Sequence, residues 1–240
     1  MDLVYELIFT VFPYLCLATF VVGHAYRYIT DRYAWNAHSS QLLDKKSLFW
    51  GAVLFHVGII FTFVGHAGGL LIPQNYYDLF GINSESHLTI AYWSGAVVGI
   101  AAFVGCLLLL WRRLSNKRVR IAGTLNDIIT LGALTLVIST GVYNVFFGHY
   151  NVLYSVAPWI RGIVFFSPDP ELMRPVPLSF KSHVTAAWAL LGFSPFSRLV
   201  HIWSVPVFYF FRRRILFRRQ PEIKPGIEGL SPLEPEGKEG

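Results

Sequence analysis

The stretch FHVGIIFTFVGHAGG (residues 55–69) decides the fold, because it is apolar enough for a membrane span and yet contains His56 and His66. It lies in an apolar segment, residues 48–72, that exceeds the ~20 residues needed to cross a bilayer as a helix. An ionisable side chain at membrane depth is costly, so it faces the interior of a helix bundle and marks a candidate functional site. The stretch therefore predicts a membrane helix whose two imidazoles face other helices.

The whole chain has the composition of an integral membrane protein. Its 240 residues are 54% hydrophobic and only 14% charged, and its mean hydropathy is +0.48, which is far more apolar than a soluble domain. Apolar segments of sufficient length for a helical span, and too long for barrel strands, recur along the chain. They are roughly residues 3–26, 48–72, 88–111, 124–147 and 180–211. We expect an all-α bundle of five transmembrane helices. The fourth segment opens with Thr124, Leu125, Asn126 and Asp127, a polar entry that resembles a capping box with Asp in place of Glu.

The basic residues predict the orientation of this bundle. Lysines and arginines gather between the first and second segments, between the third and fourth, and after the fifth, while the opposite loops are acidic or mixed. The positive-inside rule then places the N-terminus outside and the C-terminus in the cytoplasm. The net charge of +6 follows from this topology, so we expect no nucleic-acid partner. We expect residues 1–219 to form the membrane domain and residues 220–240, rich in Pro, Gly and Glu, to form a flexible cytoplasmic tail.

The spacing of the histidines within the apolar segments indicates a cofactor. His56 and His66 lie in the second segment, and His183 and His201 lie in the fifth, which runs in the opposite direction. Antiparallel packing pairs His66 with His183 and His56 with His201. A single intramembrane histidine is as often an interhelical hydrogen-bonding group, but paired imidazoles in an apolar bundle are typical of haem ligation. Since the chain lacks a C-x-x-C-H motif, two non-covalent b haems are expected.

Straight helices would fit these pairs imperfectly. On a continuous helix His183 and His201 would be about 27 Å apart along the axis, whereas His56 and His66 would be about 15 Å apart. Tilted haem planes, the reach of the imidazoles, or a bend at Pro195 would absorb the difference. Arg198 precedes His201 by three residues and either neutralises haem propionates or extends toward the cytoplasmic interface.

Three segments resemble a known family. SSQLLDKK (39–46), FHVGIIFTFVGH (55–66) and PFSRLVHIWSVP (195–206) are similar to the gamma subunit of respiratory nitrate reductase, a di-haem cytochrome b that anchors its enzyme and oxidises quinol. The likeness extends along residues 11–211. It implies a multi-pass protein of the cell (inner) membrane that takes electrons from menaquinol or ubiquinol.

The resemblance also implies specific ligands and partners. His66 and His183 match the axial ligands of the outer haem, and His56 and His201 match those of the inner haem. The implied partners are a cytoplasmic iron-sulfur subunit and a molybdenum catalytic subunit on which nitrate is reduced, so this chain would be the quinol-oxidising part of the enzyme.

We expect quinol to bind at the outer haem, around Gly65, Gly69 and His87. The segment GINSESH (81–87) lacks the lysine expected of relatives there and offers Glu85 and His87 instead. As a histidine in a short outer loop, His87 would be either a quinol proton acceptor or a solvated side chain.

Two other functions remain open from the sequence. A homologous di-haem subunit of another reductase complex would share the histidines, although PFSRLVHIWSVP disfavours it. A histidine-lined metal or proton transporter is the alternative of a different class. Against transport, the second and fifth segments contain no intramembrane Asp or Glu.

Overall fold

The structure, a computed structural model, describes residues 3–31 and 45–204, all within the compact unit Met1–Val205. In these two ranges the regular secondary structure is entirely helical, with no strand, which confirms the all-α prediction. The expected boundary between residues 219 and 220 lies outside the described residues, as does most of SSQLLDKK.

Four helical segments of the described residues are long and apolar enough to cross a membrane. Leu3–Thr30 consists of α1 (Leu3–Glu6), η1 (Leu7–Val11) and most of α2 (Phe12–Asp31). Leu48–Leu71 consists of most of α3 (Lys45–His66) and of η3 (Ala67–Leu71). Ser84–Ser115 is α5, and Leu125–Gly148 consists of α7 (Leu125–Tyr143) and η4 (Asn144–Gly148). The short helices α4 (Gln74–Leu79) and α6 (Lys117–Ile121) lie in the connections.

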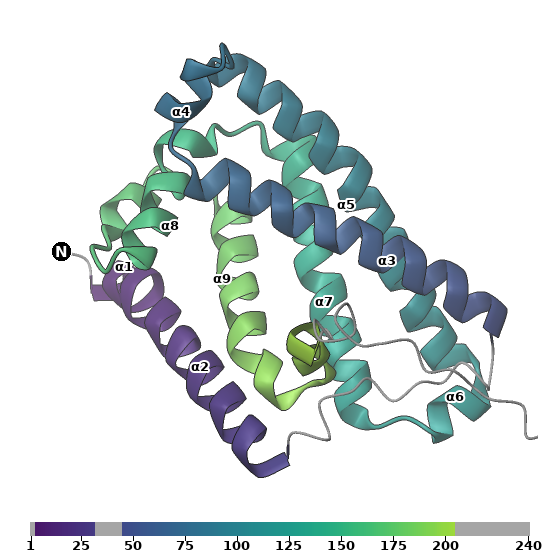
Figure 1. The fold of residues 1–240 in the computed structure, drawn as a ribbon. Coiled ribbons are helices and arrows are strands. Elements are labelled where there is room, and N and C mark those ends of the chain that lie inside the picture. Colours follow the sequence, from purple (N-terminus) through teal and green to yellow (C-terminus); the bar gives the residue numbers. More distant parts are fainter. Residues whose placement is uncertain (1–2, 32–44, 205–240) are drawn as a thin grey trace, which may run out of the picture. The chain divides into compact units, whose positions relative to one another are not determined.

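The fifth predicted segment is not one continuous helix. Its α-helix α9 (Leu178–Phe193) has 16 residues, and the 3-10 turns η7 (Ser194–Phe196) and η8 (Arg198–Ser204) follow. Pro195 has no amide hydrogen to donate to the Leu191 carbonyl, and its ring blocks a further α-turn. That carbonyl accepts instead from Ser194 Oγ at 2.7 Å. The expected bend is therefore a full break, after which η8 lies beside α7 (Figure 1).

Helices α3 and α5 pack closely because glycines remove side chains from their crossing (Figure 1). A Cβ added at Gly58 would overlap the backbone of Ala102, and one at Gly105 would overlap the backbone of Phe55. Around this crossing, α7 and η8 complete a buried apolar cluster; it contains Phe55, Ala102, Cys106, Leu134, Ile138 and Leu199. Gly58 and Gly105 thus allow the close packing of α3 on α5.

A second packing arrangement holds α9 against α2 (Figure 1). Arg27 Nη1 donates to the carbonyls of Pro195 at 2.8 Å and Ser197 at 3.1 Å, just where α9 ends. On the other side α7 begins with the capping box expected from Thr124 and Asp127, in which each side chain bonds the other's backbone N–H. The Arg27 bonds hold the chain just before η8 (Arg198–Ser204), the element that contains His201.

The proline-rich connection of residues 148–180 is ordered around a tryptophan. It contains η5 (Val152–Tyr154), α8 (Val156–Val164) and η6 (Pro170–Met173). Trp159 is fully buried, and its Nε1 donates to the Phe9 carbonyl at 2.9 Å. Pro13, four residues after Phe9, has no N–H for that carbonyl, so the indole replaces the missing helical bond. Helix α8 therefore packs against the N-terminal span.

Candidate functional site

Four histidines meet in two pairs where α3 faces α9 and η8. The ring centroids of His66 and His183 are 6.3 Å apart, and those of His56 and His201 are 6.2 Å apart. Because the chain breaks at Pro195, His201 does not continue along the axis of α9. The mismatch between about 27 and about 15 Å calculated for straight helices therefore does not arise.

All four rings share one hydrogen-bonding pattern, in which Nδ1 contacts a backbone carbonyl. The acceptors are Ala52 O for His56 at 2.8 Å, Thr62 O for His66 at 2.8 Å, Val137 O for His183 at 3.1 Å and Arg198 O for His201 at 2.5 Å. A carbonyl oxygen can only accept, so each Nδ1 carries the hydrogen and each Nε2 carries a lone pair. Metal-bound histidines have this arrangement, which fixes both the tautomer and the ring orientation.

The separation within each pair suits a single metal ion between the rings. A metal–imidazole bond is about 2 Å long and the ring centre lies about 1 Å behind the nitrogen, so two imidazoles on opposite sides of one metal have centroids about 6 Å apart. The described part of the chain contains no group of three or more His, Cys, Asp or Glu that could hold a metal. Each pair can thus supply two axial ligands to a group that brings its own equatorial donors, as the porphyrin of haem does.

Two glycines leave space for and beside the imidazoles of His66 and His183. A Cβ at Gly65 would have no heavy atom within 4 Å, so the backbone beside His66 borders open space. At Gly141 of α7, a Cβ would stand only 2.9 Å from His183 Cε1. A flat ring can approach the backbone at Gly65. At Gly141 the absence of a side chain leaves space for the His183 imidazole.

A largely buried ion cluster lies beside the pair His56 and His201. Asp127 is 3% exposed and pairs with both Arg113 and Arg198. The Nη2 of Arg198 donates to Asp127 Oδ2 at 2.8 Å. The Arg198 backbone carbonyl is the acceptor for His201, so this cluster also holds the ring. The sequence predicted Asp127 only as a helix cap, and no spacing rule connects residues so distant in the chain. The predicted propionate contact of Arg198 stays a prediction.

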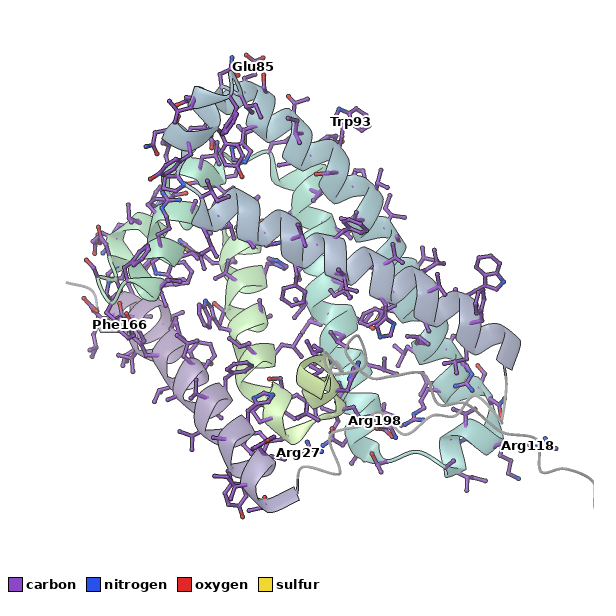
Figure 2. All side chains as sticks on the ribbon, viewed as in Figure 1. Arg27, Glu85, Trp93, Arg118, Phe166 and Arg198 are labelled. Carbon is purple, nitrogen blue, oxygen red and sulfur yellow. The ribbon has the colours of Figure 1, made fainter. Side chains whose placement is uncertain are left out.

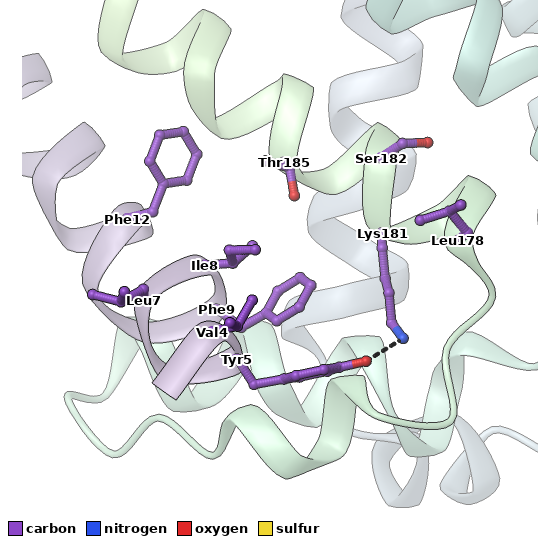
Figure 3. A pocket seen from close by; sticks show the side chains of 10 residues that line it. All are labelled: Val4, Tyr5, Leu7, Ile8, Phe9, Phe12, Leu178, Lys181, Ser182 and Thr185. Carbon is purple, nitrogen blue, oxygen red and sulfur yellow. Dashed lines mark hydrogen bonds between the residues drawn. The ribbon is translucent and has the colours of Figure 1, made fainter. Parts of the chain in front are cut away.

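The start of α9, which carries His183, is tied to the N-terminal helix. Lys181 Nζ donates to Tyr5 Oη at 2.8 Å and to the Arg174 carbonyl at 3.1 Å. Together these elements border an open, mostly apolar cavity of about 570 Å³ (Figure 3). It is lined by Val4, Tyr5, Leu7, Ile8, Phe9, Phe12, Leu178, Lys181, Ser182 and Thr185. The lysine bond thus anchors the N-terminal end of α9, two residues before His183.

Two of the three residues expected at the quinol site lie together. His87 Nε2 is 3.7 Å from the position of a Cβ on Gly69, in the π-helical turn η3 that follows His66. The placement of His87 in a short outer loop was wrong: it occupies the first turn of α5 and is only 7% exposed. Asn83 caps this helix by accepting from Ser86 N at 2.9 Å, which draws His87 into regular structure. Gly65 lies one turn before Gly69, beside His66.

The fold and the paired imidazoles define the class: an all-helical protein with long apolar spans and two sites of paired histidines. A family model described as nitrate reductase gamma subunit matches residues 5–220. The nitrate reductase gamma chain of Bacillus subtilis is 38% identical over 219 residues, which cover 90% of this chain and 98% of that protein. The respiratory nitrate reductase 2 gamma chain of Escherichia coli is 34% identical over 215 residues, 88% of this chain and 95% of that protein.

A third relative embeds the same unit in a longer chain. The nitrate reductase-like protein NarX of Mycobacterium tuberculosis is 34% identical over 228 residues, which cover 92% of this chain and 35% of NarX. The chain belongs to the nitrate reductase gamma subunit family. It is accordingly a subunit of an oxidoreductase complex in electron transport, and four helical segments of its described residues are long and apolar enough to cross a membrane.

Proposed function

We propose that the chain is the membrane subunit that oxidises quinol for a respiratory nitrate reductase and passes the electrons inward through two b haems to a cytoplasmic iron-sulfur subunit. The observation that carries this proposal is the presence of two imidazole pairs at 6.2 and 6.3 Å with every Nδ1 bonded to a carbonyl. Each haem, when bound, supplies a one-electron redox centre. His66 and His183 hold the outer haem, and His56 and His201 hold the inner one.

The protein's own contribution is to fix these ligands before the cofactor binds. The carbonyl bonds of His56 and His66 come from the residues four positions earlier on α3, so the helix itself aims both rings. His183 is fixed across a helix interface, by the Val137 carbonyl of α7. Such bonds also make the ligating nitrogen a better donor to iron.

The quinol site of the proposal lies at the outer pair, around Gly65, Gly69 and His87. The glycines leave room for a planar head group beside His66, and His87 takes a proton from the quinol hydroxyl. An outer site releases protons outside while electrons move inward. Moving one charge across the membrane stores about 2.3 kcal/mol per 100 mV of membrane potential. Quinol oxidation at an outer site therefore stores part of its free energy as this potential.

The proposed topology has five spans, with α9 and the segment after it as the fifth, in the cell (inner) membrane. The N-terminus is outside and the C-terminus is cytoplasmic. In support, Arg27, Arg118 and Arg198 lie toward one end of the helices and Glu85 lies at the other (Figure 2). The end that carries the arginines is the cytoplasmic one.

Nitrate is reduced on partner subunits in this proposal. The chain has only two cysteines, Cys16 and Cys106, both in apolar segments, whereas an iron-sulfur cluster needs four ligands. The cytoplasmic loops and residues 220–240 dock an iron-sulfur subunit, which connects to a molybdenum catalytic subunit. A segment so poor in apolar side chains orders only against another chain.

The complex in oriented vesicles tests this function. Menadiol, a naphthoquinol without a tail, is added without nitrate, and haem absorbance and the pH on each side are followed together. We expect reduction of both haems and proton release on the outer side. Proton release on the cytoplasmic side would contradict the outer site, and haems that menadiol leaves oxidised would contradict quinol oxidation.

A further inference from the structure

The amide of Gln74 is held in a single orientation by two acceptors. Its Nε2 donates to Asp78 Oδ1 at 2.9 Å and to the Ile82 carbonyl at 2.9 Å. Neither a carboxylate nor a carbonyl can donate, so both contacts require the NH2 group on that side. The amide oxygen, Oε1, must therefore point the other way, toward His87.

This orientation decides the tautomer of His87. The distance from His87 Nδ1 to Gln74 Oε1 is 2.7 Å, and an amide oxygen only accepts, so Nδ1 carries the hydrogen. The lone pair is left on Nε2. No bond of Nε2 to another described residue is present, and this nitrogen faces Gly69, 3.7 Å from the position of a Cβ there. The Tyr77 ring, 4.3 Å from the imidazole centroid, packs on the ring.

We infer that Gln74, oriented by Asp78, is a positioning residue that presents His87 Nε2 as the proton acceptor for quinol. The inference rests on the proposed quinol site at Gly65 and Gly69. In the step it describes, the quinol O–H bond breaks, an N–H bond forms at His87 Nε2, and the electron pair stays on the quinol oxygen, from which the proposed electron path takes its electrons. Nδ1 keeps its own hydrogen throughout.

The surroundings explain why an amide serves here. Neutral Gln74 cannot itself take the proton, so the imidazolium keeps the proton until it returns to water from Nε2 on the outer side. At this end of the packed elements, the other titratable or charged groups are Tyr76, Tyr77 and Asp78 of α4, Glu85 at the start of α5, and Arg161 of α8. Arg161 donates to the Leu70 carbonyl of η3 at 2.9 Å. Asp78 reaches the ring only through the Gln74 amide, so it favours the imidazolium without binding it directly.

Two substitutions at one position separate this role from simple packing. Gln74→Met keeps the length of the side chain and removes the strong acceptor, so the Nδ1–H tautomer is no longer enforced. We expect haem reduction by menadiol to slow about fivefold at every pH, the effect of losing one ordinary hydrogen bond. Gln74→Glu keeps an acceptor for Nδ1 but turns its second oxygen toward Asp78 Oδ1, so it is made together with Asp78→Asn, whose amide can donate to that oxygen. In this double variant the maximal rate should stay within about twofold. Because a carboxylate stabilises the imidazolium more than an amide does, the acid limb of the rate–pH profile should move to higher pH.

The measurement is stopped-flow haem reduction by menadiol in the complete complex from pH 5 to 9, with haem content determined for every variant. Asn75→Leu, which alters the exposed amide next in sequence, is the matched control and should leave the profile unchanged. In a His87→Gln background, Gln74→Met should cause no further loss. A wild-type rate for Gln74→Met, equal losses for Gln74→Met and the double variant, or additive losses with His87→Gln would each overturn the inference and leave the quinol site standing. If menadiol does not reduce the unmodified complex, the proposed function fails first.

Discussion

Asp127→Ala tests the ion cluster beside the inner imidazole pair. The Asp127 side chain is 3% exposed and pairs with Arg113 and Arg198. It also accepts the Thr124 backbone N–H at 2.7 Å in the capping box of α7. Alanine removes all of these contacts and leaves two guanidinium groups without their carboxylate.

The structure sets the size of the effect. Removing one partner of a buried ion pair costs about 3–5 kcal/mol, because the remaining charge is uncompensated, and losing the reciprocal cap adds about 0.5–1 kcal/mol. The Arg198 side chain is 28% exposed and can turn toward the interface, which reduces the first figure toward its lower end. We expect Asp127→Ala to lower the free energy of unfolding by about 3–4 kcal/mol. Asp127→Asn, which keeps an acceptor oxygen, should cost about 1–3 kcal/mol.

Denaturant titration in detergent micelles, followed by circular dichroism, measures these differences. Leu125→Ala, at a residue 73% exposed and two positions earlier on α7, is the control and should change stability by about 0.5 kcal/mol or less. Since the Arg198 carbonyl orients His201, the alanine variant should also lose the inner haem before the outer one on heating. A midpoint for Asp127→Ala equal to that of Leu125→Ala would refute the assigned role of the cluster.

Three further predictions follow from close contacts. Gly141→Ala places a Cβ 2.9 Å from His183 Cε1 and should weaken or abolish haem binding at the outer pair alone, as haem content per chain would show. Gly105→Ala drives a methyl group into the Phe55 backbone and should destabilise the α3–α5 crossing by more than 1 kcal/mol, measured by the same titration. Arg27→Leu removes two bonds to the carbonyls at the end of α9 and should increase protease cleavage there, whereas Arg27→Lys should show a smaller increase.

The parts of the fold that could be predicted are those that depend on local sequence. Long apolar segments specify membrane-length helices because each backbone polar group must be satisfied within its own segment. The capping box at Thr124 and Asp127 was likewise visible in four consecutive residues and is confirmed. The course of the chain after Pro195 was not predictable in this way. A proline states where an α-helix ends but not where the next residues go.

Contacts between distant residues explain the remaining differences at the candidate site. The sequence placed His87 in a short outer loop, because nothing nearby in sequence shows that Gln74 folds back on it from α4. Similarly, Arg198 and Asp127 are 71 residues apart, and no periodicity connects them. The histidine pairs were accessible from the sequence only because helix direction, a topological property, decides which ends of two spans meet.

Haem content and the reduced-minus-oxidised spectrum of the four single histidine variants test the central claim most directly. The unmodified chain should bind two b haems. His66→Ala and His183→Ala should each lose the same haem, and His56→Ala and His201→Ala should each lose the other, as the ring separations of 6.3 and 6.2 Å require. Loss of the same haem by His66→Ala and His201→Ala, or two haems retained in any of the four variants, would contradict the account.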